Sequence, residues 1–215
     1  TFVGNPLNVT ASSTAGPSRI PNLWGTFVAG TVTTPGRYIF RDKANFPLMT
    51  YAEIQFIKAE AAFIKGDKAL PLAAYKKGIE ASIDFVNLNT VVSTTYPITT
   101  TITATEKANF LANVNVVPAE VDLTMSHIIL QKYISLFGFG DLEAWTDMRK
   151  YHYDNVNIYK TMAFPTSLFA DNGGKLPYRV RPRFNSEYVW NFASLQAIGA
   201  DKVDYHTVEM WYSKP

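Results

Sequence analysis

The stretch AEIQFIKAEAAFIKGD, residues 52–67, decides how this chain folds. Read at about 3.6 residues per turn, one side of it carries four large apolar residues, namely Phe56, Ile57, Phe63 and Ile64. Glu60 projects into the middle of that side, where a lone carboxylate is costly to bury without a partner. The pair Gly66–Asp67 then breaks the pattern. The stretch therefore predicts a packed helix over about 51–65, in which Glu60 is either a tuned acid or a structural group.

A second helix follows this break, with the sequence LPLAAYKKGIEASIDFVN at residues 70–87. Its apolar stripe consists of Leu72, Tyr75, Ile79, Ile83 and Val86. Gly78 costs about 1 kcal/mol of helix propensity relative to alanine, so its presence favours close contact with another helix. Two helices joined by a short turn, with small residues on their facing sides, indicate a tetratricopeptide-like hairpin over 51–87. Because such hairpins normally stack in groups of roughly three or more, we expect neighbouring hairpins outside this chain.

The rest of the chain is predicted to be mainly α, with long ordered loops and minor β. Residues 1–50 form an irregular segment, expected to continue from a missing N-terminal part, and 51–215 form the helical region. The candidate short strands are GTFVAGTV (25–32) and RYIF (37–40), and the Thr-rich residues 88–105 are predicted to be a loop or a small hairpin. Further helices are expected from about Glu106, over 121–137, over 141–151 with Asp141 as the cap, and within 185–199.

Composition excludes several classes of function. The chain has 215 residues, of which 47% are hydrophobic, and this is enough for a real core. It has 20 Lys and Arg against 18 Asp and Glu and no basic run, which disfavours nucleic acid as a partner. Cysteine is absent, so disulfides and thiolate metal sites are excluded. The three histidines lie far apart, and no nucleotide-binding or nucleophile motif occurs. We therefore predict no cofactor and no metal site, and no apolar run reaches the length of a membrane span.

Glu60 has two interpretations. As a general acid it would have a raised pKa and would need a second carboxylate, for which Glu53 lies two turns away on the same helix. As a structural group it would be buried and paired with a cation or with hydrogen-bond donors, and Arg149 in EAWTDMRK is the partner we expect. The rarity of unpaired buried charge favours the structural interpretation. Trp145 lies four residues before Arg149; the two are predicted to share a core-facing side of a helix, with a ligand platform as the alternative.

Several motifs occur in the order typical of one family. AEIQFIKAEAAFIKGD and AAYKKGIEASI are followed by IILQKYISLFGFGDLEAWTDMRKYHY, and a closing pattern comprises Arg181, Arg183, Glu187, Asn191 and Trp211. Over residues 51–215 the chain resembles the C-terminal part of SusD/RagB proteins. It departs from the family at Lys150, where a second arginine is frequent, and in the insert at 88–105; residues 1–50 match weakly.

The resemblance implies a surface nutrient-binding lipoprotein of Bacteroidetes that is not an enzyme. Such proteins bind oligosaccharides or peptides and sit as a lid on a SusC-like TonB-dependent transporter in the outer membrane, into which they pass the ligand. Their lipid anchor would lie upstream of Thr1. The resemblance also makes Glu60, Gly78, Trp145 and Arg149 structural motif residues. A helical adaptor for another protein remains the alternative function, and a glycoside hydrolase is disfavoured.

The ligand site is expected in the loops of residues 20–46. Aromatic residues alternate there with polar ones, and aromatic faces pack on sugar rings while polar neighbours bind hydroxyls. The candidates, in order, are Trp24 and Tyr38, together with Arg37, Asn22 and Phe27; Phe40 and Phe46 complete the aromatic set. In the alternative interpretation, these aromatic residues anchor the loop to the helices.

Overall fold

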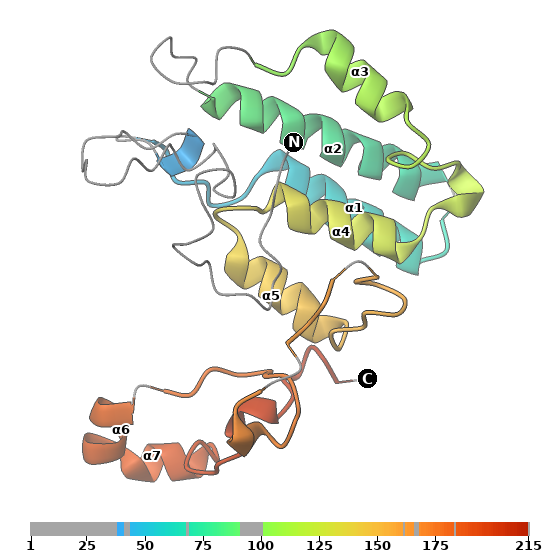
Figure 1. The fold of residues 1–215 in the computed structure, drawn as a ribbon. Coiled ribbons are helices and arrows are strands. Elements are labelled where there is room, and N and C mark those ends of the chain that lie inside the picture. Colours follow the sequence, from blue (N-terminus) through green and yellow to red (C-terminus); the bar gives the residue numbers. More distant parts are fainter. Residues whose placement is uncertain are drawn as a thin grey trace.

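The structure, a computed structural model, describes residues 38–40, 44–67, 69–90, 101–160, 162–165, 168–182 and 184–214. Its helices are α1 (Tyr51–Ile64), α2 (Ala69–Asn89), α3 (Ala104–Ala112), α4 (Met125–Ser135), α5 (Asp141–Lys150), α6 (Phe184–Trp190) and α7 (Phe192–Ala197) (Figure 1). Short 3-10 segments lie at Tyr38–Phe40, Glu120–Asp122, Ala170–Asn172 and Tyr205–Thr207. The mainly α prediction is confirmed. The minor β is not found in the described parts, where Tyr38–Phe40 forms a 3-10 turn instead of the expected strand; residues 25–32 lie outside them.

Helices α1 and α2 form the predicted antiparallel hairpin (Figure 1). Thr50 caps α1 by accepting a hydrogen bond from the backbone N–H of Glu53 at 3.2 Å. Gly66, at φ 83°, provides the left-handed turn after α1 that glycine adopts without strain. A Cβ added to Gly78 would lie 2.8 Å from Cζ of Phe56, so the close approach inferred from Gly78 is confirmed.

Helix α4 covers the hairpin and completes its core (Figure 1). The buried cluster comprises Ala52, Phe56, Ala59, Ala74, Tyr75, Ile79, Leu123 and Ile128. The predicted buried side of α1 was partly wrong, because Ile57 and Ile64 are exposed. The buried side instead contains three alanines, whose small size lets the neighbouring helices approach closely. The outer side of α1 therefore presents Tyr51, Ile54, Ile57 and Ile64.

The later helices differ from their predicted bounds at the N-terminal ends. α4 begins at Met125 and not at 121, because Thr124 caps it and Nδ1 of His127 accepts a hydrogen bond from the Thr124 backbone N–H. Asp141 is not a cap but the first residue of α5, which follows Gly140. α3 begins at Ala104, inside the predicted Thr-rich loop, of which residues 91–100 lie outside the described range.

The C-terminal segment, residues 153–214, lies beyond α5 and carries α6 and α7 apart from the layer of α1, α2 and α4 (Figure 1). The helix predicted over 185–199 is split in two at Asn191. A small second cluster of Leu195, Ala200 and Tyr205 holds this end together. None of the described helices combines the length and the apolar character that crossing a membrane requires.

Candidate functional site

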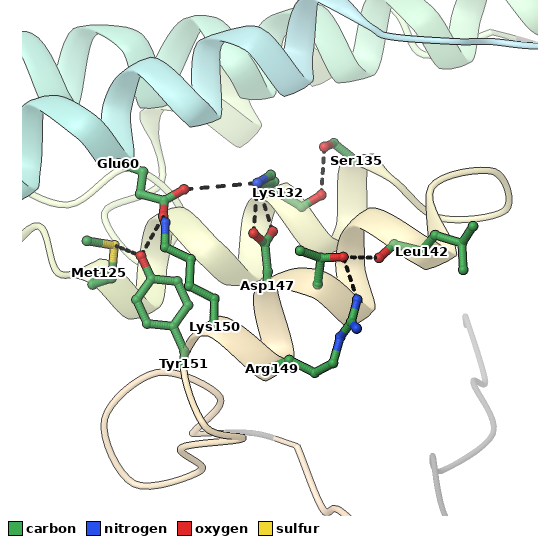
Figure 2. A network of polar contacts seen from close by, with 10 residues as sticks. Glu60, Met125, Lys132, Ser135, Leu142, Asp147, Arg149, Lys150 and Tyr151 are labelled. Atoms are coloured by element: carbon green, nitrogen blue, oxygen red, sulfur yellow. Dashed lines mark hydrogen bonds and ion pairs between the residues drawn. The ribbon is translucent and has the colours of Figure 1, made fainter. Parts of the chain in front are cut away.

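Glu60 lies at the centre of a buried polar network that joins α1, α4 and α5 (Figure 2). Its Oε1 accepts hydrogen bonds from Nζ of Lys150 at 2.5 Å and from the Tyr151 hydroxyl at 2.6 Å. Its Oε2 lies 4.0 Å from Nζ of Lys132, which also binds Asp147 at 2.8 Å. The prediction that Glu60 is buried and paired is confirmed, but the expected partner was wrong: Lys150 takes the place of Arg149.

The charges in this network decide what Glu60 can do. Burial by itself would raise the pKa of Glu60, but the hydrogen bonds from Lys150 and Tyr151, with the charges of Lys150 and Lys132, lower it. A general acid needs a raised pKa, so Glu60 is unsuited to that role. Burial raises the pKa of Asp147 and of Glu53, but both side chains are buried between helices and neither lines the groove described below. The network is therefore a structural junction.

Arg149 belongs to a different set of contacts. Its guanidinium lies 3.8 Å from the centre of the Trp145 ring and donates to the Tyr178 carbonyl at 3.1 Å and to the Thr146 hydroxyl at 2.8 Å. Trp145 in turn donates from Nε1 to the Tyr153 hydroxyl at 2.8 Å. The cation–π pair considered as a ligand platform is thus occupied by contacts within the protein, and it joins α5 to the C-terminal segment.

The residues expected to bind ligand are only partly described. Trp24, Asn22, Phe27 and Arg37 lie outside the described residues. Tyr38 is 5% exposed and packs edge-on against Phe85 of α2, with ring centres 5.9 Å apart. Burial raises the pKa of its hydroxyl to about 12. Tyr38 therefore anchors its loop to the hairpin, which was the alternative interpretation for these aromatic residues, and its ring is not free to stack on a ligand.

A groove of about 630 Å³ opens where the end of that loop meets the C-terminal half of α2. One wall is the run 46–52, which comprises Phe46, Pro47, Leu48, Met49, Thr50, Tyr51 and Ala52. The other wall consists of Ala81, Asp84, Phe85 and Leu88. Phe46, Leu48 and Leu88 are 75%, 92% and 78% exposed, so large apolar side chains face solvent on both walls. Exposed apolar side chains on both sides of one hollow make this groove the candidate interaction site.

The base of the groove is held by packing behind it. Phe85 lies between Tyr38 and Phe139, with ring centres 5.9 Å and 5.6 Å away. The other wall continues into the first turn of α1, which Thr50 caps. Tyr38 thus supports the groove from the rear, and among the five named candidates it is the one whose place the structure describes.

The lining of the groove limits its chemistry. Asp84 is the single carboxylate among the described residues that line it, whereas glycoside hydrolysis typically uses two. Within the described residues, no group of three His, Asp or Glu side chains is placed to hold a metal ion.

Sequence reasoning included Phe46 in its aromatic set but missed the rest of the groove. The signal was present in α2, where Ala81, Phe85 and Leu88 follow one another at helical spacing beside the predicted stripe. The opposite wall is a run of four apolar residues, FPLM at 46–49, directly before the helix cap. What the sequence does not reveal is that these two segments, more than 30 residues apart along the chain, face one another.

Comparisons with known proteins place the chain in one family. Neither a search of curated proteins nor a search of solved structures found a match. Residues 25–181 match the model of the SusD-like family, which is described as starch-binding and associating with the outer membrane. This range covers well over half of the chain and contains both the groove and the Glu60 network, while the closing motif from Arg183 onward lies beyond it. The chain therefore belongs to the SusD-like family of starch-binding proteins that associate with the outer membrane.

Proposed function

We propose that this protein binds nutrient oligomers at the cell surface and delivers them to a SusC-like TonB-dependent transporter. The observation that carries the proposal is the groove between residues 46–52 and α2, in a chain whose family is described as starch-binding. Its open apolar walls and single carboxylate favour capture without chemistry. Holding an oligomer beside the transporter raises its local concentration at the entrance.

The ligand site is proposed to extend from this groove to the residues expected from the sequence. Trp24, with Asn22, Phe27 and Arg37, remains a proposed contributor, and Phe46 connects that segment to the groove. Tyr38 is assigned a supporting role because it is buried behind Phe85.

The outer side of α1 supports a protein partner. Tyr51, Ile54, Ile57 and Ile64 are exposed there beside Lys58, and several large apolar side chains exposed on one side of a helix are typical of a surface that another protein covers. We assign this side to contact with the transporter or with a neighbouring helical hairpin. We further propose that the protein is an outer-membrane lipoprotein on the cell surface.

The same side of α1 favours one alternative, a helical adaptor that binds another protein and no nutrient. Co-purification tests the difference. The tagged full-length protein should be isolated from its own membranes with a TonB-dependent transporter, and the complex should retain nutrient oligomers. Isolation with a different protein and without any oligomer would favour the adaptor. Release of reducing sugar by the purified protein would instead establish a hydrolase.

A further inference from the structure

We infer that the groove between residues 46–52 and α2 binds an apolar peptide segment that carries a basic residue, and not a bare glycan. This inference rests on the proposed function and decides between its two classes of nutrient. It follows from three features of the groove: the kind of apolar side chains on its walls, the other roles of its polar groups, and the position of its one charge.

The apolar walls are largely aliphatic. Leu48, Met49 and Leu88 are exposed on the two sides, and Phe46 and Tyr51 are the exposed aromatic residues. Sugar sites combine flat aromatic faces with many hydrogen-bonding groups, because every hydroxyl that leaves water needs a partner. Flexible methionine and branched leucine side chains are instead suited to accommodate apolar side chains of a peptide.

Two hydroxyl side chains belong to the described lining, Thr50 and Tyr51, and the Thr50 hydroxyl is engaged within the protein because it accepts the hydrogen bond that caps α1. Asn87, next to Leu88 in the sequence and two residues before the end of α2, exchanges two hydrogen bonds with the backbone of Ile102, both at 2.9 Å. A glycan in the groove would therefore meet few partners for its hydroxyls, and an apolar peptide side chain needs none.

Among the described lining residues the one charge is Asp84, which lies on the α2 wall between Ala81 and Leu88. Nζ of Lys107 binds its Oδ1 at 2.6 Å, yet the Asp84 side chain remains 62% exposed. A lysine or arginine of a ligand seated against Leu88 thus has access to this carboxylate. The charge selects a basic residue beside the apolar anchors, and it would repel an acidic one.

The test uses the full chain and two probes, a random hexapeptide pool and maltoheptaose. Bound peptides are separated by ultrafiltration and identified by mass spectrometry, and maltoheptaose binding is measured by calorimetry. We expect the bound peptides to be enriched in leucine, phenylalanine or methionine together with lysine or arginine, and we expect maltoheptaose not to compete with them.

Variants assign the binding to the groove. Leu48→Asp and Leu88→Asp should each reduce peptide retention by about tenfold or more, since they place a charge where an apolar anchor is seated. Val121→Asp is the matched control, because Val121 is equally exposed but lies outside the groove. Asp84→Asn should leave the apolar enrichment and remove the preference for basic residues. Circular dichroism melting confirms that each variant is folded.

Three results would overturn the inference. Peptide enrichment that survives both leucine variants would place the site elsewhere. Maltoheptaose binding that the leucine variants abolish, without peptide enrichment, would make the groove a glycan site and would leave the proposed function intact. If neither probe binds the parent protein, the assignment of the groove to nutrient capture falls together with the inference.

Discussion

The two halves of this molecule are held together by different means. In the hairpin and α4, side chains pack against side chains: Phe56 contacts Gly78 directly, and the buried cluster contains eight apolar residues. In the C-terminal segment, guanidinium groups bind backbone carbonyls. Arg149 donates to Tyr178, Arg179 to Glu209 at 2.8 Å, and Arg181 to Lys202 at 2.7 Å. The first half is built on one large apolar cluster, and the second combines a small cluster of Leu195, Ala200 and Tyr205 with individual polar contacts.

The Glu60 network and the cation–π pair of Arg149 with Trp145 lie next to one another on α5 and connect these halves. Lys150 and Asp147 contact Glu60 of the hairpin and Lys132 of α4 (Figure 2). Arg149 instead contacts the C-terminal segment through the Tyr178 carbonyl. Adjacent residues on one helix therefore serve opposite sides. Mutations on the two sides should separate the contributions of the halves to stability.

The largest effect is expected inside the hairpin. Phe56→Ala removes a fully buried ring from the contact between α1 and α2 and should lower the free energy of unfolding by about 3–5 kcal/mol. Phe169→Ala, at an exposed position of the C-terminal segment, is the control and should change it little. Urea denaturation measures both. Equal losses would contradict the difference drawn between the halves.

Gly78→Leu tests the close approach itself. Its Cβ would lie within 3.0 Å of the Phe56 ring, so the helices must move apart, at a cost of about 1–3 kcal/mol. Ala73→Leu adds the same side chain on the exposed side of α2 and should have little effect. If the two variants melt at the same temperature, Gly78 is not at a restrictive contact.

The sequence predicted the hairpin well for a physical reason: Gly78 and the apolar periods of α1 and α2 are local signals of packing. It failed where the answer depended on three-dimensional neighbours. Lys150 and not Arg149 binds Glu60 because of how α5 is rotated against α1, and no periodicity shows this. Tyr38 is buried because Phe85, far along the chain, lies beside it. The groove was missed because its two walls are distant in sequence.

Removing Glu60 should also destabilise the protein. Glu60→Ala leaves the buried amine of Lys132 and the Tyr151 hydroxyl with one partner fewer, at a cost of about 1–3 kcal/mol. Glu53→Ala is a control within the same helix. Burial raises the pKa of Glu53, and Lys150 pairs with Glu60 and not with Glu53. A Glu60 variant as stable as its parent would mean that the network does not join the halves. Chemical denaturation at pH 7 measures the difference.

The same network predicts opposite pH dependences for two carboxylates. The pKa of Glu60 is lower in the folded protein than the unfolded value of 4.5. Ionised Glu60 therefore stabilises the folded protein above pH 4.5, and this stabilisation is lost as the pH falls through the folded pKa. The folded pKa of Asp147 is raised, so its ionisation costs stability as the pH rises through that value. Between about pH 5 and pH 3, Glu60→Gln should lose less stability than the parent, and Asp147→Asn should lose more. The melting temperature of each variant relative to the parent, measured across that range, tests both predictions. Differences from the parent that change in the same direction for the two variants would contradict the assignment.

Arg149→Lys should loosen the connection to the C-terminal segment and leave the hairpin intact. Lysine retains the charge but cannot stack flat on Trp145 while also donating to Tyr178 and Thr146, so we expect a loss of about 1–2 kcal/mol. Hydrogen exchange locates the effect. Faster exchange should appear at the amides of Tyr178 and Arg179, which donate to the His206 carbonyl beside that junction, and not in α1 or α2. Faster exchange in the hairpin would show that the halves are one cooperative unit.

The smallest effect on stability is expected on the outer side of α1, opposite Phe56. Ile64 is 63% exposed, so Ile64→Glu should change the free energy of unfolding by no more than about 0.5 kcal/mol. The same variant places a charge in the surface that we assign to a protein partner, and a buried unpaired charge is costly at an interface. Co-purification of the transporter should therefore fall while the melting temperature stays. Lys65→Glu, one residue further on and also exposed, is the matched charge control. If Ile64→Glu melts early, the outer side of α1 belongs to the core; if it melts with the parent and retains the partner, the contact lies elsewhere on the protein.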